Sequence, residues 1–447
     1  MSAAKATGLA AGFHELARRF RVPGAQLVVT DAGEPVVLDH GVTDHGTRQP
    51  VTAESKFPLG SVGKMFTATV VMMLVSDGDL DLDTPVGQYV PELRTAPDGI
   101  AASVTVRHLL SHTSGLASDL AAESAHAGSR LKYLRDGCRT GLMFAPGSIF
   151  SYSNVGYVLA GHLIEAVTGM TWWDAVETLL MRPLGITPSF VTAPAGVSGA
   201  PFVSGHVVGD QVRVIREQTL LPAEAPIGAV AASASDLAKL GALLIGDVGG
   251  WAQEFTFGEM LKPVGGAEPF GIADGWGLGA ALYRAESVDW WGHDGSGDGT
   301  SCHLRGDPVN GVVVALTTNA TAGYAMWKCL AEVLADAGVD MPVERAAGSK
   351  HAVLKHAAPP PSCAGRYVNG DTEYDVALGD DGLLYLQIAG ERHSRLDCYE
   401  DLTFSVHDLV SGNPDYLGRF VRADGTGRIE SVQVSGRTAV RVPGDAE

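Results

Sequence analysis

The chain has 447 residues, of which 45% are hydrophobic and 19% are charged, and its formal net charge is −19. This length allows about two or three domains, and this composition is typical of a globular protein. A strongly acidic surface repels phosphate groups, so we expect no nucleic-acid partner. The longest apolar run, 68–75, stops at the polar turn 76–79 and falls short of the ~18 residues that a membrane span needs, so we expect no membrane partner.

The N-terminal segment 1–20 lacks a basic start followed by an apolar stretch. It predicts an amphipathic helix of the folded protein and not a signal peptide, which favours a cytoplasmic location. The five cysteines are scattered and form no C-x-x-C pair. We therefore expect neither a disulfide framework nor a zinc site, and no metal or other cofactor.

The first half of the chain predicts short strands followed by helices. Residues 25–42 predict two strands around the turn 31–35. A long apolar helix is predicted from Ser61 onward, after a Pro-Gly turn. Residues 104–116 predict a short helix that ends at Gly115.

The middle of the chain continues with helices and then turns to β structure. Apolar residues recur with helical spacing in 152–169, which predicts a loop leading into a helix. Residues 232–246 predict another helix, with Ser235 or Asp236 as its N-cap. Two β-rich runs then suit adjacent strands of one antiparallel sheet, and they cover 276–295 and 300–319.

The C-terminal part has a different pattern of predicted secondary structure, which indicates a separate small domain. A helix over 325–338 closes a first domain, 1–345, and a linker with a stiff run of prolines follows over 346–362. The remainder, 363–447, alternates short strands and turns, which predicts a small antiparallel barrel or sandwich. The hairpins are predicted over 374–388 and 420–434.

A candidate nucleophile lies at the start of the apolar helix. Ser61 and Lys64 are three residues apart, so on a helix their side chains project from one face. Ser61 can then act as a nucleophile with Lys64 as its base, if burial or a neighbouring positive charge lowers the pKa of the lysine. The Ser61 N–H can stabilise an oxyanion. The alternative is a helix cap beside a surface lysine.

Two further groups suit the same chemistry. Tyr152 can relay a proton at a serine, and Asn154 can hold a substrate carbonyl or orient the lysine. The alternative is that Asn154 caps a helix with Tyr152 packed beneath it. His293 opens a glycine-rich turn and can donate to a substrate carbonyl or assist the tyrosine. In that turn Gly295 allows close approach of a ligand, and the N–H of Ser296 can supply a second oxyanion donor; the alternative is a plain hairpin loop.

Taken together, S-x-x-K, Y-x-N and a basic-x-Gly triplet, in this order, resemble the serine penicillin-recognising family of class C β-lactamases, D,D-peptidases, D-aminopeptidases and esterases. The resemblance covers about residues 10 to 340, and it is carried by PLGSVGKMFTA, VTVRHLLSHTSGL, FAPGSIFSYSNVGY and WWGHDGSG. It implies an α/β sandwich with a mainly antiparallel sheet and an all-α insertion. It also implies that Ser61 is the nucleophile, Lys64 its partner, and Tyr152 and Asn154 the second element.

One departure from the family pattern favours the aminopeptidase, esterase and acyl-transfer branches of the family over the β-lactamases. His293 stands where β-lactamases and most D,D-peptidases carry the lysine of K-T-G, which recognises a substrate carboxylate. The barrel, opening at Gly365-Arg366-Tyr367, looks like the lipocalin-like domains of some D-aminopeptidases and of stand-alone penicillin-binding-protein-type thioesterases. The run GHDGSGDGTSCHLR is most similar to those thioesterases, which release nonribosomal peptides as head-to-tail macrolactams.

The resemblance therefore implies an acyl-transfer enzyme that prefers a D-residue on the acyl side. Its substrate would be a peptidyl thioester, which a carrier protein of a nonribosomal peptide synthetase can present. Arg437, from the last predicted hairpin, can pair with a substrate carboxylate; the alternative is a solvated surface arginine. A D-stereospecific aminopeptidase, amidase or esterase with the same nucleophile is the second hypothesis, and a non-catalytic penicillin-binding-like sensor is the third.

Overall fold

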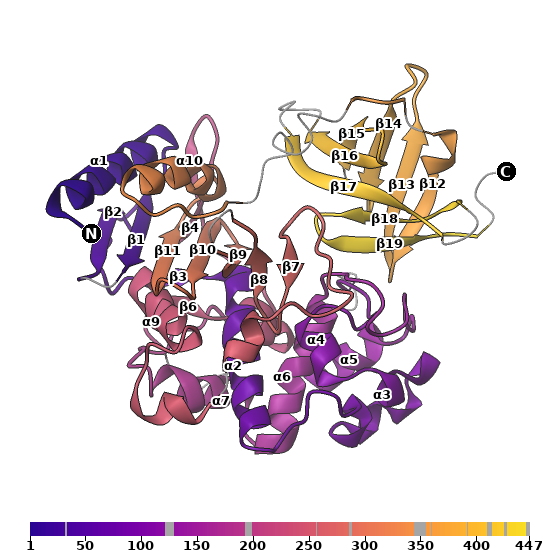
Figure 1. Ribbon diagram of the computed structural model, residues 1–447, viewed down its shortest axis with the longest axis horizontal. Helices are drawn as coiled ribbons and strands as arrows, with labels where there is room; N and C mark the ends of the chain where they lie inside the picture. The colour runs from indigo at the N-terminus through magenta and orange to yellow at the C-terminus, as the bar shows by residue number, and fades with distance from the viewer. Residues whose placement is uncertain are drawn as a thin grey trace.

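The computed structural model of the chain has an α/β unit followed by a β-barrel (Figure 1). The structure describes residues 1–31, 34–120, 129–192, 199–255, 257–285, 288–343, 355–358, 360–390, 392–408, 414–423 and 427–443. Most of the linker predicted over 346–362 lies outside these ranges. None of the described helices is long and apolar enough to cross a membrane.

A seven-stranded antiparallel sheet organises the first unit. Its order is β2 (Val36–Gly41), β1 (Gly24–Thr30), β11 (Val312–Thr318), β10 (Thr300–Asp307), β9 (Trp290–Gly297), β8 (Ala281–Tyr283) and β7 (Gly275–Trp276). This sheet confirms that the two β-rich runs form adjacent strands. Its central strands are buried on both faces, as expected for a sheet that lies between helical layers.

Helices cover both faces of the sheet, and the side-chain alternation of β1 shows why. Leu27 and Val29 pack in one core with helices α1 (Ala3–Arg19) and α10 (Gly323–Asp336). Val28, between them, belongs to the core on the opposite face. That core contains α2 (Gly63–Ser76), α6 (Asn154–Thr168) and α9 (Ala234–Leu244), which lie below the sheet in Figure 1.

Shorter helices and ladders complete this first unit. Along the chain, these helices come after α2 and before β7. They are α3 (Ile100–Ser103), α4 (Val106–Leu110), α5 (Arg130–Gly137), α7 (Trp172–Ala175) and α8 (Ala225–Gly228). Two small ladders pair β3 (Phe57–Pro58) with β6 (Ala231–Ala232) and β4 (Gly205–Val208) with β5 (Val212–Ile215). The β3–β6 ladder leads directly into the segment that carries Ser61.

Eight strands close the C-terminal unit into an antiparallel barrel, which confirms the predicted small barrel. They are β12 (Gly365–Asn369), β13 (Thr372–Leu378), β14 (Leu384–Ile388), β15 (Arg392–Cys398), β16 (Thr403–Asp408), β17 (Pro414–Arg422), β18 (Ile429–Val434) and β19 (Arg437–Arg441). Both predicted hairpins are present, as β13–β14 and β17–β18. Closure pairs β19 with β12, so the barrel has no free edge.

Two local predictions were wrong. The helix predicted over 104–116 ends at Leu110, because the next residues turn away: His112 adopts a left-handed φ of 56°, and the Ser111 and Thr113 hydroxyls bond to each other at 2.8 Å. The N-cap of α9 is Ser233, neither Ser235 nor Asp236. The Ser233 hydroxyl accepts from the Asp236 N–H, and the Asp236 carboxylate accepts from the Ser233 N–H, which completes a capping box.

Candidate active site

Ser61 lies in a single 3-10 turn, Gly60–Val62, immediately before α2. This turn packs directly against the backbone of β9. A Cβ on Gly295 would lie 3.0 Å from Ser61 N and 2.2 Å from Leu59 O, so only glycine fits there. A Cβ on Gly60 would lie 2.9 Å from Ser296 N. The structure therefore brings the backbone amides of Ser61 and Ser296 to one place, as two oxyanion donors require.

Lys64 is fully buried one turn after Ser61. Its Nζ donates to Ser61 Oγ at 3.2 Å and to the Ile227 carbonyl at 3.2 Å. Burial lowers the pKa of Lys64 to about 7; Asp119 and Glu224 raise it, and Arg437 lowers it further. A lysine that is partly neutral near pH 7 can accept the proton of the serine hydroxyl. The alternative of a surface lysine is wrong.

Tyr152 packs against the lysine from the side. Lys64 Nζ lies 5.0 Å from the centre of the Tyr152 ring. Burial raises the pKa of Tyr152, although the neighbouring Ser61 hydroxyl opposes this effect, so the phenol keeps its proton at neutral pH. The Tyr152 hydroxyl is buried and has no hydrogen-bond partner within the described part of the chain. It is therefore available to a reacting group.

His112 supports this tyrosine from behind. Its ring stacks on Tyr152 with centroids 4.2 Å apart, and its Nδ1 accepts the Ser153 N–H at 3.0 Å. Burial, followed by the charge of Lys64, lowers the pKa of His112 well below its usual value, so the ring is neutral. The sequence motif that contains His112 was recognised, but its contact with Tyr152 was not.

Asn154 is the first residue of α6, and the N-cap is Ser153, whose hydroxyl accepts the Gly156 N–H. The alternative that Asn154 caps the helix is therefore wrong. Its Nδ2 donates to Asp119 Oδ1 at 2.5 Å. Its Oδ1 is buried and has no partner among the described residues. Sequence analysis missed Asp119, because nothing in its local sequence indicates a partner in α6.

His293 is buried on β9, and its hydrogen bond defines its tautomer. Nδ1 lies 2.7 Å from the Asp294 carbonyl, which can only accept, so Nδ1 carries the proton. Burial, followed by the charge of Lys64, lowers the pKa of His293 to about 4. The ring is thus neutral and leaves Nε2, which has no partner within the described residues, as an acceptor. The predicted donation to a substrate carbonyl does not fit this tautomer.

Asp294, the residue after His293, is held by the buried Arg305 and by the buried His303. Arg305 donates to both carboxylate oxygens, at 2.9 and 2.8 Å, and His303 lies 2.7 Å from one of them. Burial raises the pKa of Asp294, but Arg305 and His303 outweigh it and hold that pKa well below its usual range. This fixed carboxylate anchors the backbone that presents His293 and Gly295.

Arg437, at the start of β19, reaches the site from the barrel. Its Nε donates to Asp119 Oδ2 at 3.0 Å, and its Cζ lies 5.5 Å from the centre of the Tyr152 ring. The β18–β19 turn is inserted next to it, since the Tyr152 N–H donates to the Gly436 carbonyl at 2.9 Å. The alternative that Arg437 is a solvated surface residue is therefore wrong.

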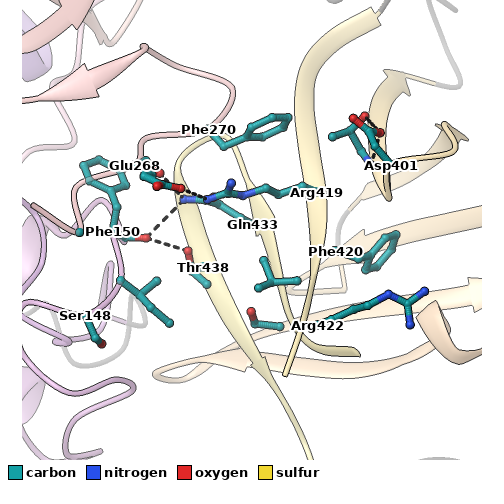
Figure 2. A pocket seen from close by; sticks show the side chains of 15 residues that line it. Ser148, Phe150, Glu268, Phe270, Asp401, Arg419, Phe420, Arg422, Gln433 and Thr438 are labelled. Carbon is teal, nitrogen blue, oxygen red and sulfur yellow. Dashed lines mark hydrogen bonds and ion pairs between the residues drawn. The ribbon is translucent and has the colours of Figure 1, made fainter. Parts of the chain in front are cut away.

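The barrel hairpin is anchored to the segment before Tyr152. Figure 2 shows Thr438 and Gln433 directed at the Phe150 carbonyl, with Arg419 and Glu268 beyond them. These residues line a cavity of about 600 Å³ between the two units. Thr438 Oγ1 donates to the Phe150 carbonyl at 2.8 Å and Gln433 Nε2 at 3.3 Å. The barrel is thus built into the wall that carries Tyr152.

All eight candidate residues thus lie in one region. Gly295 and Ser296 take part through their backbone, and the other six take part through their side chains. The arrangement supplies a nucleophile, a base, a proton-bearing phenol, paired backbone donors and an arginine from a second unit. This set can carry out acyl transfer through a serine ester. Among the described residues, no group of three or more His, Cys, Asp or Glu side chains is arranged to hold a metal ion.

Comparison with known proteins agrees with this arrangement. The Beta-lactamase family model matches residues 9–338. Penicillin-binding protein 4 of Amycolatopsis lactamdurans is 35% identical over 345 residues, which are 74% of this chain and 90% of that protein. Esterase EstB of Burkholderia gladioli is 34% identical over 222 residues, covering 46% of this chain and 56% of that one.

Solved structures extend the similarity to the barrel. The crystal structure of SurE superposes with a TM-score of 0.84 at 36% identity and covers 98% of this chain and 99% of its own. A crystal structure of SurE with D-Leu matches at 35% identity with the same TM-score, covering 99% of this chain and 100% of its own. The predicted resemblance is confirmed for the fold and for the two-part plan. The chain belongs to the beta-lactamase family of serine hydrolases and is SurE-like over its whole length.

Proposed function

We propose that the protein is a penicillin-binding-protein-type thioesterase that receives a peptidyl group on Ser61 and releases it as a head-to-tail macrolactam. The observation that carries this proposal is the buried Lys64 bonded to Ser61 Oγ, in a site that the barrel completes with Arg437. The whole-chain similarity to SurE, including its structure with D-Leu, supports a peptide substrate with a D-residue on the acyl side.

Acylation follows from the geometry. Neutral Lys64 takes the Ser61 proton as Oγ attacks the thioester carbonyl, and the amides of Ser61 and Ser296 stabilise the oxyanion. The carbon–sulfur bond then breaks, and the thiolate receives a proton from the Lys64 ammonium or through Tyr152. The products are a serine ester and a free thiol, and the lysine is neutral again.

Release of the peptide repeats these steps in reverse order. The peptide's own amine attacks the ester carbonyl, its proton passes to Lys64, and the carbon–oxygen bond to Ser61 breaks as Oγ regains a proton. The neutral Nε2 of His293 and the Oδ1 of Asn154 are acceptors suited to substrate N–H groups. Arg437, with its terminal nitrogens, suits an acceptor oxygen of the bound peptide, such as a side-chain carboxylate or a backbone carbonyl.

The second candidate is a D-stereospecific amidase, aminopeptidase or esterase that uses the same serine ester and lets water attack it. A linear peptidyl thioester mimic with a free amine and a C-terminal D-residue separates the two. Cyclic product, identified by the loss of one thiol and no gain of water in its mass, supports the proposal. Linear acid as the sole product, with turnover of D-amino acid amides, supports the alternative.

Ser61→Ala tests the nucleophile in either case. We expect the variant to show no covalent adduct by intact mass with the thioester mimic or with a fluorophosphonate, because it lacks the hydroxyl that Lys64 Nζ contacts. Ser296→Ala is the matched control, since it keeps the Ser296 backbone amide and should still form the adduct. An adduct of unchanged yield on the Ser61→Ala protein would contradict the assignment.

Delivery by a carrier protein and a cytoplasmic location are further parts of the proposal. A pull-down with an acidic carrier protein loaded with a non-hydrolysable peptidyl amide tests the first. Fractionation of the source cells tests the second. Capture by the loaded carrier alone, and not by the unloaded one, is the result expected for a presented thioester.

A further inference from the structure

Asp119 connects the catalytic unit to the barrel at the centre of the candidate site. Its Oδ1 accepts from Asn154 at the start of α6, at 2.5 Å, and its Oδ2 accepts from Arg437 of β19, at 3.0 Å. One carboxylate therefore holds a side chain from each unit. Neither the motifs nor the proposed chemical steps assign it a role.

The contact with Asp119 decides which way the Asn154 amide faces. A carboxylate only accepts hydrogen bonds, so the amide must turn its Nδ2 toward Asp119. Oδ1 is then left buried without a partner among the described residues. In this orientation Asn154 can accept an N–H of the substrate but cannot donate through the nitrogen already used.

The same carboxylate orients the arginine. Arg437 uses Nε for Asp119, so the edge formed by its two terminal nitrogens is left for a bidentate contact with another carboxylate. The side chain is partly exposed and lies over the Tyr152 ring, 5.5 Å from its centre. Without Asp119, nothing among the described residues would fix the rotation of this guanidinium.

The backbone around Asp119 is braced by both units. The Asn154 N–H donates to the Ser118 carbonyl at 2.7 Å, and the Ser118 N–H donates to Asn369 Oδ1, on β12 of the barrel, at 2.7 Å. Asn369 Nδ2 in turn donates to the Thr438 carbonyl at 2.7 Å, one residue from Arg437. Asp119 is therefore placed accurately enough to position its two partners.

We propose that Asp119 is a positioning residue that sets Asn154 as an acceptor for the substrate amide N–H and presents the free edge of Arg437 to a substrate carboxylate. This inference rests on the proposed serine-ester site and names the recognition elements of that site. It gives the barrel a direct part in substrate recognition.

The test compares two acyl groups on the same thiol: acetyl, which has no amide, and N-acetyl-D-alanyl, which carries one. For Asp119→Ala we expect kcat/KM with the N-acetyl-D-alanyl thioester to fall about tenfold to hundredfold, as for loss of a partly buried hydrogen bond to a charged group. With the acetyl thioester we expect a change below about threefold. Asp119→Asn keeps the side-chain shape and guards against misfolding; an intermediate loss is expected.

Asp371→Ala is the matched control. Asp371 pairs with Arg139 at 3.0 Å, also between barrel and catalytic unit, and its carboxylate holds neither Asn154 nor Arg437, so we expect both thioesters to react at wild-type rates. A purely structural role of Asp119 predicts that both acyl groups lose the same factor, or that neither changes. Either result for Asp119→Asn would overturn the proposal.

A pH profile supplies an independent readout. The charged groups that act on Lys64 are Asp119 and Glu224, which raise its pKa, and Arg437, which lowers it. Removing the Asp119 charge must therefore move the acidic limb of the acylation profile to lower pH. Asp371→Ala should leave that limb in place, and an unshifted limb for Asp119→Asn would contradict the proposed position of the carboxylate.

The proposed function and this inference fail in different ways. If the wild-type protein reacts with a fluorophosphonate at Ser61 but with no thioester, the thioesterase proposal fails. The comparison can then be made with the p-nitrophenyl esters of the same two acyl groups. A selective loss for the N-acetyl-D-alanyl ester in the Asp119 variants would still support the positioning role.

Discussion

At the scale of single residues, the proposed acylation of Ser61 depends on the burial of Lys64. Lys64 has no exposed surface, its Nζ faces Ser61 Oγ and a carbonyl, and two aromatic rings lie within reach of its charge. Desolvation disfavours the ammonium, and this is the main reason that the pKa of Lys64 falls to about 7. The buried position of the amine is therefore what makes it a usable base.

The pH dependence of acylation follows from this value. Lys64 must be neutral to take the serine proton, so the rate of Ser61 acylation should rise about tenfold per pH unit below pH 7 and level off above it. His293, with a pKa of about 4, adds no step between pH 5 and 8, and Tyr152, whose pKa is raised, adds no loss below pH 9. Thiol release measured from pH 5 to 9 checks this expectation.

A flat profile from pH 5 to 8 would exclude Lys64 as the base. Lys64→Ala should remove most of the acylation rate at every pH, because Lys64 is the basic side chain that contacts Ser61 Oγ. Lys239→Ala serves as the control lysine. It lies on the exposed side of α9 and should leave the profile unchanged.

At the scale of elements, the site depends on a strand and a 3-10 turn that approach more closely than side chains allow. Gly60 has a left-handed φ of 53°, and its missing Cβ leaves room for the Ser296 backbone. Gly295 likewise leaves room for the carbonyl of Leu59 and the amide of Val62. The two glycines set the spacing between the 3-10 turn η1 (Gly60–Val62) and β9, and this spacing determines how close the two proposed oxyanion donors lie.

Gly295→Ala should therefore damage catalysis directly. A Cβ 2.2 Å from the Leu59 carbonyl must push β9 away from η1 and separate the two amides. Loss of one oxyanion donor costs about a hundredfold to a thousandfold in kcat, and we expect an acylation rate lower by this amount. Gly275→Ala, in β7 of the same sheet, is the control.

At Gly275 the nearest atom to a Cβ would be Leu282 Cβ at 3.7 Å, an ordinary contact. The control should therefore acylate at the wild-type rate. Stopped-flow thiol release and thermal unfolding of both variants separate a catalytic loss from an unfolded protein. Wild-type acylation by Gly295→Ala would show that the close approach does not set the donor geometry.

At the scale of the whole molecule, the barrel is joined to the catalytic unit through buried hydrogen bonds and not only through exposed ion pairs. Asn369 is 1% exposed and links the Ser118 N–H, the Ser151 hydroxyl and the Thr438 carbonyl. Buried polar groups that lose their partners are costly, so these contacts fix the barrel in one position. That position carries Arg437 to Tyr152.

Asn369→Ala should release this junction. It leaves the Ser118 N–H and the Thr438 carbonyl without their partner, and we expect the free energy of unfolding to fall by about 2–4 kcal/mol. Asp371→Ala breaks a partly exposed ion pair at the same junction and should cost below about 1 kcal/mol. Urea unfolding followed by limited proteolysis measures both effects. Equal losses for the two variants would contradict the conclusion that the buried hydrogen bonds of Asn369 fix the barrel in position.

The sequence by itself indicated most of the larger strands and helices and the residue types of the candidate site. β-rich runs predicted neighbouring strands of the sheet, alternating short strands and turns predicted the barrel hairpins, and three short motifs contain Ser61, Lys64, Tyr152 and His293. Local hydrogen bonds overrode the pattern at two places, the left-handed His112 and the Ser233 cap, because short polar side chains compete with the helix there.

Only the tertiary structure decided how these groups are used. Burial lowers the pKa of Lys64, the Asp294 carbonyl fixes the tautomer of His293, and Asp119 joins Asn154 to an arginine far away in the sequence. These effects depend on desolvation and on contacts between distant segments, neither of which has a local sequence pattern. The motifs give the residue types, whereas the protonation and orientation of these residues depend on the packing of the fold.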